Sequence, residues 1–449
     1  MGRLFGTDGA RGVANTELTA ELAMNIGRAA AMVLVNDEVK HPTILIGKDT
    51  RLSGDMLEGA LIAGLCSVGA NVKLLGVVPT PAVAYLVKKY NADAGVMISA
   101  SHNPFEFNGI KIFSSEGYKL PDDLENRIEE IVLDHAVPYA TANDGEIGRV
   151  DTLESAVDDY INHVAEAVGE DLSGMEVALD CSNGSSSRTA EKLFTKLGVK
   201  VQMLFDEPDG ININKDCGST HTKKLQEYVR KNKLSAGLAF DGDADRCLAV
   251  DENGNLVDGD FLIAICANDM MKNGKLKKNT AVGTVMTNMG FSKFCEANGI
   301  DFVSTKVGDR YVLESMLQNG YNIGGEQSGH IIFLDHSTTG DGELSGAMLL
   351  SIMKRTGEKL SDLAKIMERY PQVLINVKVS NEGKLSFYTD KEVKAEIDRV
   401  TEILGDTGRI LVRVSGTEPL VRVMLEGENL EQIQTLAEEA AQVVRERLA

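Results

Sequence analysis

The chain has 449 residues, too many for one hydrophobic core, because single cores stop growing near about 250–300 residues. Hydrophobic residues make up 43% and charged residues 25%, a composition typical of multidomain globular proteins and not of disordered chains. The formal net charge of −21 disfavours nucleic acid and anionic membranes as partners, so an anionic small substrate would need local clusters of Arg and Lys.

The six cysteines are scattered and form no Cys-x-x-Cys pair, so a disulfide scaffold is not indicated. The amino-terminal segment lacks the apolar region of a signal peptide, and no run of about 18 apolar residues occurs. We therefore expect a cytoplasmic protein with no membrane partner.

The first 150 residues predict an α/β domain. Short apolar runs alternate with amphipathic stretches in a βαβαβ order, at 43–47, 56–68, 72–77, 81–89 and 95–99. Polar, turn-rich segments at 141–148 and 251–259 mark the next joints, so we place domains at 1–150, 151–253, 254–369 and 370–449.

Ser101 follows the last strand of the first domain. Pro104 cannot donate to a sheet, so the strand ends before it and Ser101 lies at its carboxyl end. Ligands collect outside such strand ends in open α/β sheets, which predicts a small nucleophile here. A plain turn is the alternative. A Ser-His hydrolase is disfavoured, because His102 is adjacent and no Gly-x-Ser-x-Gly surrounds the serine.

Lys111 follows this loop closely in the sequence. It can place its ammonium group in the same pocket, where the ammonium would assist proton transfer or stabilise the negative charge of a phosphoryl group. An ordinary surface lysine is the alternative.

The second and third domains repeat the α/β pattern. Predicted strands lie at 175–180, 199–205, 236–240 and 280–284, and predicted helices lie near 188–197, 261–271 and 310–318.

Asp241, Asp243 and Asp245 alternate in a loop between two predicted strands of the second domain. Like charges so close are tolerated mainly where a hard cation binds, and oxygen-only ligands favour Mg²⁺ over zinc. An EF-hand calcium loop matches at four positions, but Arg246 replaces its essential glycine and the flanks are strands. A solvated acidic turn is the other alternative.

Two further loops carry polar groups in the third and fourth domains. The glycine-rich turn at 324–330 offers carboxylate, amide, hydroxyl and imidazole groups suited to a sugar. The fourth domain is a smaller α+β unit, with predicted strands at 373–379, 409–414 and 421–425 and a closing helix at 430–448. Its loop between Arg413 and Arg422 places hydroxyls and backbone N–H groups between two guanidinium groups, which suits a phosphate. A plain hairpin is the alternative.

Together these four loops resemble the α-D-phosphohexomutase superfamily over essentially the whole chain and in the same order. The segments 5–12 and 47–54 also resemble superfamily signatures. The resemblance implies an α/β protein of four domains around a central cleft, three similar α/β domains plus the smaller α+β domain, each contributing one loop.

The resemblance also implies roles for individual residues. Ser101 matches the phosphoserine, and with the three aspartates of its loop it would hold Mg²⁺. Glu326, Ser328 and His330 match the sugar-binding loop, and five residues match the phosphate-binding loop: Arg413, Ser415, Gly416, Thr417 and Arg422. Lys111, Arg246, His102 and Arg11 complete the expected catalytic group.

Within the superfamily, Gln327 and the segment 216–221 resemble the branch that interconverts glucosamine 6-phosphate and glucosamine 1-phosphate for UDP-N-acetylglucosamine and peptidoglycan synthesis. Phosphorylated Ser101 would donate to the sugar, glucosamine 1,6-bisphosphate would be the intermediate, and a homodimer is expected. Three alternatives remain: a phosphomannomutase/phosphoglucomutase, a metal-dependent phosphatase, and a noncatalytic sugar-phosphate or metal-binding module.

Overall fold

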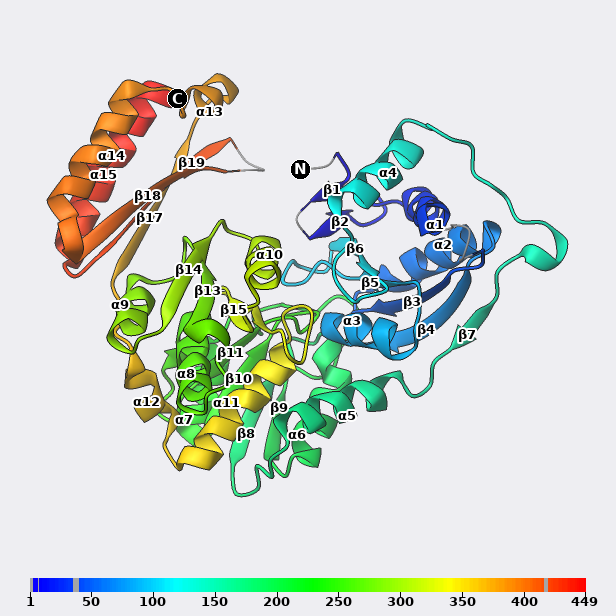
Figure 1. Cartoon of the computed structure of the whole chain (residues 1–449), viewed down its shortest axis with the longest axis horizontal. Coiled ribbons are helices and arrows are strands. Elements are labelled where there is room, and N and C mark those ends of the chain that lie inside the picture. Colours follow the sequence, from blue (N-terminus) through cyan, green and yellow to red (C-terminus); the bar gives the residue numbers. More distant parts are fainter. Residues whose placement is uncertain (1–2, 7, 35–39, 416–418) are drawn as a thin grey trace. The chain divides into compact units, whose positions relative to one another are not determined.

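The computed structural model describes residues 3–6, 8–34, 40–415 and 419–449 (Figure 1). It divides into two compact units. The first comprises Met1–Met286 and Gly299–Ile366, and the second comprises Thr287–Asn298 and Met367–Ala449. The first unit contains a seven-, a five- and a four-stranded sheet, and the second contains a three-stranded sheet.

The first sheet has the order β1-β2-β6-β5-β3-β4-β7. Its strands β5, β3, β4 and β7 run parallel, while β1, β2 and β6 pair antiparallel. The elements are β1 (Phe5–Gly6), β2 (Gly9–Val13), α1 (Ala20–Leu34), β3 (Thr43–Lys48), α2 (Gly54–Ser67), β4 (Asn71–Val77), α3 (Thr80–Lys89), β5 (Ala94–Ile98), β6 (Phe107–Ser114), α4 (Asp122–Leu133) and β7 (Val150–Thr152).

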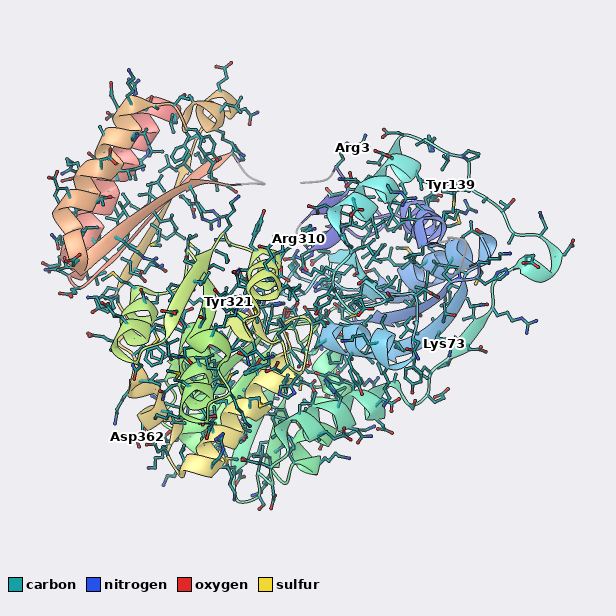
Figure 2. All side chains as sticks on the ribbon, in the orientation of Figure 1. Arg3, Lys73, Tyr139, Arg310, Tyr321 and Asp362 are labelled. Atoms are coloured by element: carbon teal, nitrogen blue, oxygen red, sulfur yellow. The ribbon has the colours of Figure 1, made fainter. Side chains whose placement is uncertain are left out.

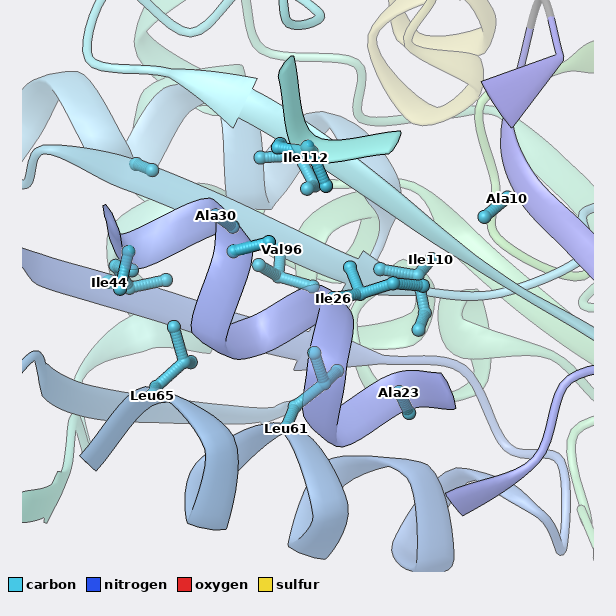
Figure 3. Packing of buried hydrophobic residues seen from close by; sticks show 14 of the residues in the cluster. Ala10, Ala23, Ile26, Ala30, Ile44, Leu61, Leu65, Val96, Ile110 and Ile112 are labelled. Carbon is cyan, nitrogen blue, oxygen red and sulfur yellow. The ribbon is translucent and has the colours of Figure 1, made fainter. Parts of the chain in front are cut away.

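Helices cover the first sheet on both faces because successive strand residues point to opposite sides. Ile44 and Val96 point to the face covered by α1 and α2, where they are buried with Ile26 and Leu61 (Figure 3). Gly95 points to the opposite face. A Cβ built on it would lie 2.5 Å from a methyl group of α3, so the glycine lets this helix approach closely. The core thus fixes the strand ends that carry the serine loop.

The second and third sheets are also mixed, with the orders β12-β11-β10-β8-β9 and β14-β13-β15-β16. The elements around the five-stranded sheet are α5 (Ala156–Val168), β8 (Glu176–Asp180), α6 (Ala190–Lys196), β9 (Lys200–Leu204), α7 (Lys223–Asn232), β10 (Ala236–Phe240), β11 (Cys247–Val250) and β12 (Leu256–Val257). Those around the four-stranded sheet are α8 (Gly259–Lys272), β13 (Thr280–Thr284), β14 (Asp301–Thr305), α10 (Asp309–Asn319), β15 (Ile323–Gly325), β16 (Ile331–Phe333), α11 (Gly342–Thr356) and α12 (Leu360–Leu363).

The second unit packs helices against the antiparallel sheet β17-β19-β18. Alternate strand residues such as Val421, Val423 and Leu425 are buried against the last helix, as a two-layer α+β arrangement requires. Its elements are α9 (Met289–Ala297), β17 (Gln372–Lys378), α13 (Asn381–Ser386), α14 (Lys391–Leu404), β18 (Gly408–Val414), β19 (Leu420–Gly427) and α15 (Leu430–Leu448).

The mixed α/β fold predicted from the sequence is confirmed, and the predicted strand 236–240 and helix 430–448 have the observed bounds. Leu256 and Val257, inside a segment that reads as a polar joint, form β12 and pair with β11. Within the described ranges, every helix is too short or too polar to cross a lipid bilayer.

Candidate active site

Ser101 lies three residues beyond the end of β5, in a tight loop at the carboxyl end of the strand. Its φ of +53° is in the left-handed region, which costs a non-glycine residue about 1–3 kcal/mol unless the surroundings enforce it. The side chain is fully buried, and Oγ donates a hydrogen bond to Oδ2 of Asp241 at 2.6 Å. The backbone N–H of Ser101 donates to Oγ of Ser99, which in turn donates to Asp49.

Arg51 and Asn214 hold this strained loop from two sides. The guanidinium of Arg51 donates to the carbonyl oxygens of Ser101 at 2.8 Å, Asn103 at 2.9 Å and Pro104 at 2.5 Å. The amide of Asn214 donates to the same carbonyls of Ser101 and Asn103, at 2.8 and 2.9 Å. The serine conformation is therefore imposed by hydrogen bonds to its backbone.

The aspartate loop joins β10 to β11 and packs against the serine loop. Ala244 has φ of +54°, so the chain turns sharply within the loop. A Cβ at Gly242 would lie only 2.5 Å from the carbonyl oxygen of Ser101, and only glycine permits this approach. Because β10 and β11 are strands, the EF-hand alternative is excluded.

Asp241, Asp243 and Asp245 are buried, and one carboxylate oxygen from each lies within 4.8 Å of the others. Burial raises the pKa of Asp241 well above its usual range, and the charges of Asp245 and Asp243 raise it further. Among the residues that the structure describes, Oδ1 of Asp243 and Oδ1 of Asp245 have no hydrogen-bond partner. Three converging carboxylates with two unsatisfied oxygens fit a hard divalent cation.

Lys111 reaches the aspartate loop from β6. Its ammonium lies 2.8 Å from Oδ2 of Asp243, 3.2 Å from Asp8 and 3.6 Å from Asp245. Burial alone would lower the pKa of Lys111, but the charges of Asp243 and Asp8 outweigh it and raise the pKa. The side chain is a buried cation.

His102 differs from Lys111 in its charge state. Burial lowers its pKa to about 4, and the positive charges of Arg246 and Arg11 act in the same direction. Its Nδ1 lies 3.4 Å from Oγ of Ser101, a long contact for a hydrogen bond. The imidazole is therefore neutral at physiological pH.

Arg246 and Arg11 add two further cations. Nε of Arg246 lies 3.8 Å from Oδ1 of Asp245, and Arg11 on β2 forms an ion pair with Asp8. Within the described part of the chain, Nε of each arginine is buried without a hydrogen-bond partner. Such donors suit the oxygens of an anionic ligand.

The glycine-rich turn connects β15 to β16. Oε1 of Glu326 accepts a hydrogen bond from the backbone N–H of Gly308 at 3.0 Å, which ties this turn to the start of α10. Oγ of Ser328 is buried and has no partner in the described ranges. These oxygen groups remain suited to sugar hydroxyls.

His330 at the end of the same turn points to the aspartate loop. Its Nδ1 lies 3.6 Å from Asp245, and its Nε2 lies 3.5 Å from Asp309. Burial would lower its pKa, but Asp245 outweighs burial and raises it. A Cβ at Gly340 would meet the imidazole ring at 2.6 Å, so this glycine leaves room for the histidine.

The predicted phosphate loop lies in the second unit, between β18 and β19. Arg413 and Arg422 are direct cross-strand partners, although like charges in such positions destabilise a sheet. Burial and the charge of Arg422 lower the pKa of Arg413. Ser415 is buried beside them. Gly416 and Thr417 lie outside the described residues.

Comparison with known proteins identifies the family. Four domain families described as phosphoglucomutase/phosphomannomutase domains I, II, III and the C-terminal domain match residues 2–136, 158–254, 258–370 and 374–443. The chain belongs to the phosphoglucomutase/phosphomannomutase family. It is therefore an isomerase acting on a sugar phosphate, and membership implies a metal ion and a phosphoserine intermediate.

Its relatives include phosphoglucosamine mutases. That of Acetivibrio thermocellus is 56% identical over 448 residues, covering 100% of both chains, and that of Clostridium novyi is 55% identical over 447 residues, covering 100% of this chain and 99% of the relative.

Solved structures share the fold. A phosphoglucomutase/phosphomannomutase family protein of Burkholderia thailandensis has a TM-score of 0.82 at 23% identity, covering 99% and 98% of the two chains. N-acetylphosphoglucosamine mutase of Aspergillus fumigatus, in complex with GlcNAc-6P and magnesium, has a TM-score of 0.71 at 18% identity, covering 99% and 96%.

In this family member, the structure of the first unit brings together residues that the sequence places far apart: Ser101, His102, Lys111, Arg11, Asp241, Asp243, Asp245, Arg246, Glu326 and His330. Ser328 lies in the same turn as Glu326 and His330. Sequence reasoning assigned no role to Asp8, Arg51 or Asp309, which contact these residues, or to Lys119, which pairs with Asp8 and Asp309. Asp8 and Arg51 lie within signature-like segments, whereas Lys119 and Asp309 carry no motif signal.

Proposed function

We propose that the chain is a phosphoglucosamine mutase, which interconverts glucosamine 6-phosphate and glucosamine 1-phosphate through phosphorylated Ser101. The observation that carries this proposal is the buried Ser101 hydroxyl, 2.6 Å from Oδ2 of Asp241 and beside the aspartate loop. Full-length relatives named phosphoglucosamine mutase at 55–56% identity support the choice of amino sugar.

The carboxylates of Asp241, Asp243 and Asp245, with an oxygen of phosphorylated Ser101, would hold Mg²⁺. Their oxygen-only donor set and the two unsatisfied carboxylate oxygens support this assignment. When bound, the ion neutralises negative charge on the phosphoryl oxygens, the main electrostatic requirement of phosphoryl transfer.

In the proposed reaction, the bond between phosphorus and the Ser101 oxygen breaks while a bond forms to a free hydroxyl oxygen of the sugar. The hydroxyl proton leaves the sugar, and a proton reaches the serine oxygen. Lys111 is the candidate general acid/base, and as a buried cation it would act first as the acid that gives a proton to the serine oxygen. The resulting glucosamine 1,6-bisphosphate returns its other phosphoryl group to Ser101, which yields the isomeric monophosphate.

The remaining predicted residues would bind and orient the substrate. His102 lies next to Ser101 and is neutral, and the charges of Arg246 and Arg11 act on it, so the unpartnered Nε donors of both arginines suit the oxygens of a phosphoryl group. Glu326, Ser328 and His330 would bind sugar hydroxyls.

The phosphate loop of the second unit has its own proposed role. The opposed guanidinium groups of Arg413 and Arg422, with Ser415, Gly416 and Thr417, would bind a substrate phosphate, whose charge relieves their repulsion. We further propose a cytoplasmic location, consistent with six free cysteines among the described residues. The homodimer that the family resemblance implies is also a proposal.

A Ser101→Ala variant tests the proposal. We expect turnover of glucosamine 6-phosphate to fall at least about a thousandfold, because no side-chain oxygen remains to carry the phosphoryl group. Intact-mass measurement should find one added phosphoryl group in the wild type and none in the variant. Ser114→Ala, at the end of β6, is the matched control and should keep both properties.

Retained turnover in Ser101→Ala would contradict the phosphoserine role. Comparison of glucosamine, glucose and mannose 6-phosphates separates this function from phosphomannomutase/phosphoglucomutase activity, and release of free phosphate would indicate a phosphatase.

A further inference from the structure

Two carboxylates of the first unit share one lysine ammonium beside the candidate active site. Nζ of Lys119 lies 2.9 Å from Oδ1 of Asp8 and 2.6 Å from Oδ2 of Asp309. The three side chains come from the loop before β2, the loop after β6 and the start of α10. Their exposed fractions are only 16–23%, so these charges interact with little screening by solvent. We call Asp8, Lys119 and Asp309 the ammonium bay.

The ammonium bay lies next to Lys111, the candidate general acid/base, and next to His330 of the proposed sugar-binding loop. Asp8 lies 3.2 Å from the ammonium of Lys111, and Asp309 lies 3.5 Å from Nε2 of His330. Gly308, the residue before Asp309, donates its backbone N–H to Glu326. A sugar bound by Glu326 and His330 would therefore lie close to the carboxylate of Asp309.

The proposed substrate carries a cation that can pair with such a carboxylate. Glucosamine differs from glucose only at C2, where it carries a primary amine that is protonated at neutral pH. C2 is bonded to C1, whose oxygen reacts in one direction of the mutase reaction, so the amine must lie near the serine and aspartate loops. The bay already holds a primary ammonium, that of Lys119, between two carboxylates.

We propose that Asp309 binds the C2 ammonium of the substrate and thereby selects amino sugars over neutral hexoses. This inference rests on the proposed function and names the group that recognises its substrate. Lys119 remains paired with Asp8 while the substrate ammonium occupies the second carboxylate. Asp8 keeps the cations of Lys119, Lys111 and Arg11, and the substrate ammonium supplies Asp309 with the charge that Lys119 otherwise shares with it. A neutral hydroxyl at C2 provides no such partner.

An Asp309→Asn variant tests the role because the amide keeps the shape of the side chain and loses its charge. We expect the ratio of kcat/KM for glucosamine 6-phosphate to that for glucose 6-phosphate to fall about tenfold or more, since charge-assisted hydrogen bonds are roughly twice as strong as neutral ones. A purely structural role would lower both values by the same factor, and an unchanged ratio would overturn the proposal.

Asp122→Asn is the matched control. Asp122 at the start of α4 forms an ion pair with the guanidinium of Arg310, the residue next to Asp309 (Figure 2), so the variant removes a nearby carboxylate outside the bay. We expect the wild-type substrate ratio in this variant. A fall equal to that in Asp309→Asn would show that selectivity follows general charge and would overturn the assignment to Asp309.

A measurement on the wild type keeps the proposal testable if the variant does not fold. Calorimetry should find tighter binding of glucosamine 6-phosphate than of glucose 6-phosphate at neutral pH. This preference should disappear as the pH rises through the pKa of the substrate amine, measured separately by NMR on the free sugar. A preference that is independent of pH across that range would contradict recognition of the ammonium.

The outcomes separate the two proposals. A wild-type protein that turns over glucose phosphates as well as glucosamine phosphates contradicts the proposed function itself. If the wild type prefers glucosamine phosphates and the Asp309→Asn variant keeps that preference, only the proposed role of Asp309 is contradicted.

Discussion

At the scale of single residues, the serine conformation depends on a buried arginine rather than on the serine itself. The side chains of Arg51 and Asp49 are fully buried and pair at 2.8 Å, and the same guanidinium donates to three carbonyls of the serine loop. A guanidinium offers five donors in a fixed planar arrangement, which an ammonium cannot reproduce. Arg51 therefore acts as a positioning residue for Ser101.

An Arg51→Lys variant should show this dependence. It keeps the positive charge, and Asn214 still donates to the carbonyls of Ser101 and Asn103, but the carbonyl of Pro104 loses its guanidinium donor, so we expect the free energy of unfolding to fall by about 1–3 kcal/mol. Turnover should fall as well, because Ser101 loses its enforced backbone conformation. Urea unfolding followed by circular dichroism measures the first effect, and Arg127→Lys on the exposed face of α4 is the control. Equal stability of Arg51→Lys and wild type would contradict the positioning role.

At the scale of elements, one carboxylate of α4 fixes the amino-terminal strand that leads to Asp8 and Arg11. Glu129 is buried and accepts hydrogen bonds from the backbone N–H groups of Arg3, Leu4 and Phe5 at 2.7–2.8 Å. Burial alone would raise the pKa of Glu129, but these three hydrogen bonds outweigh it and lower the pKa. The helix thereby holds β1 against the first sheet.

The lowered pKa of Glu129 predicts how stability depends on pH. The unfolded carboxyl binds a proton more readily than the folded one, so its contribution is complete above about pH 4.5 and is lost as the pH falls through the lower folded pKa. We expect Glu129→Gln to be about 1–3 kcal/mol less stable than wild type at pH 7, with a smaller difference near pH 3. Denaturant unfolding at pH 7 and at pH 3 measures this difference in the free energy of unfolding.

The neighbouring Glu130 provides the control for this prediction, because it is exposed on the same helix. Glu130→Gln should differ from wild type by less than about 0.5 kcal/mol at either pH. A Glu129→Gln deficit of the same size at pH 7 and pH 3 would contradict the role of the carboxylate charge.

At the scale of the whole molecule, the net charge of −21 opposes compaction. The ion pairs buried around the candidate active site attract over short distances. Most of the excess negative charges repel one another over longer distances. Salt screens exposed, distant charges first, since the Debye length falls from about 30 Å at 0.01 M to about 8 Å at 0.15 M. Ionic strength therefore separates these two contributions.

We expect the Tm at pH 7 to rise by about 1–4 °C when sodium chloride increases from about 0.01 to 0.15 M, because long-range repulsion is screened more than the buried ion pairs. Scanning calorimetry in metal-free buffer measures the shift. Choline chloride at the same ionic strength is the control for specific sodium binding and should give the same shift. A Tm that falls with salt would mean that attractive ion pairs dominate the electrostatic free energy.

Local patterns in the sequence were sufficient for the family, the main loops and many of the strands, whereas β2, β6 and β12 were not predicted. The alternation of apolar runs, Pro104 after Ser101 and three aspartates between strands are all features of short segments. Hydrophobic periodicity and turn chemistry act over a few residues, so such features can be recognised before any tertiary structure is known.

Only the tertiary structure decided which distant residues support those loops. Arg51 precedes Ser101 by 50 positions, and Lys119 precedes its partner Asp309 by 190. Neither pairing follows from local propensity, because sheet order and the packing of separate sheets bring the side chains together. The sequence by itself determined Ser101 and the aspartates as candidates, whereas tertiary packing decided the buried contacts around them, since ion pairs form between whichever charges the fold makes neighbours.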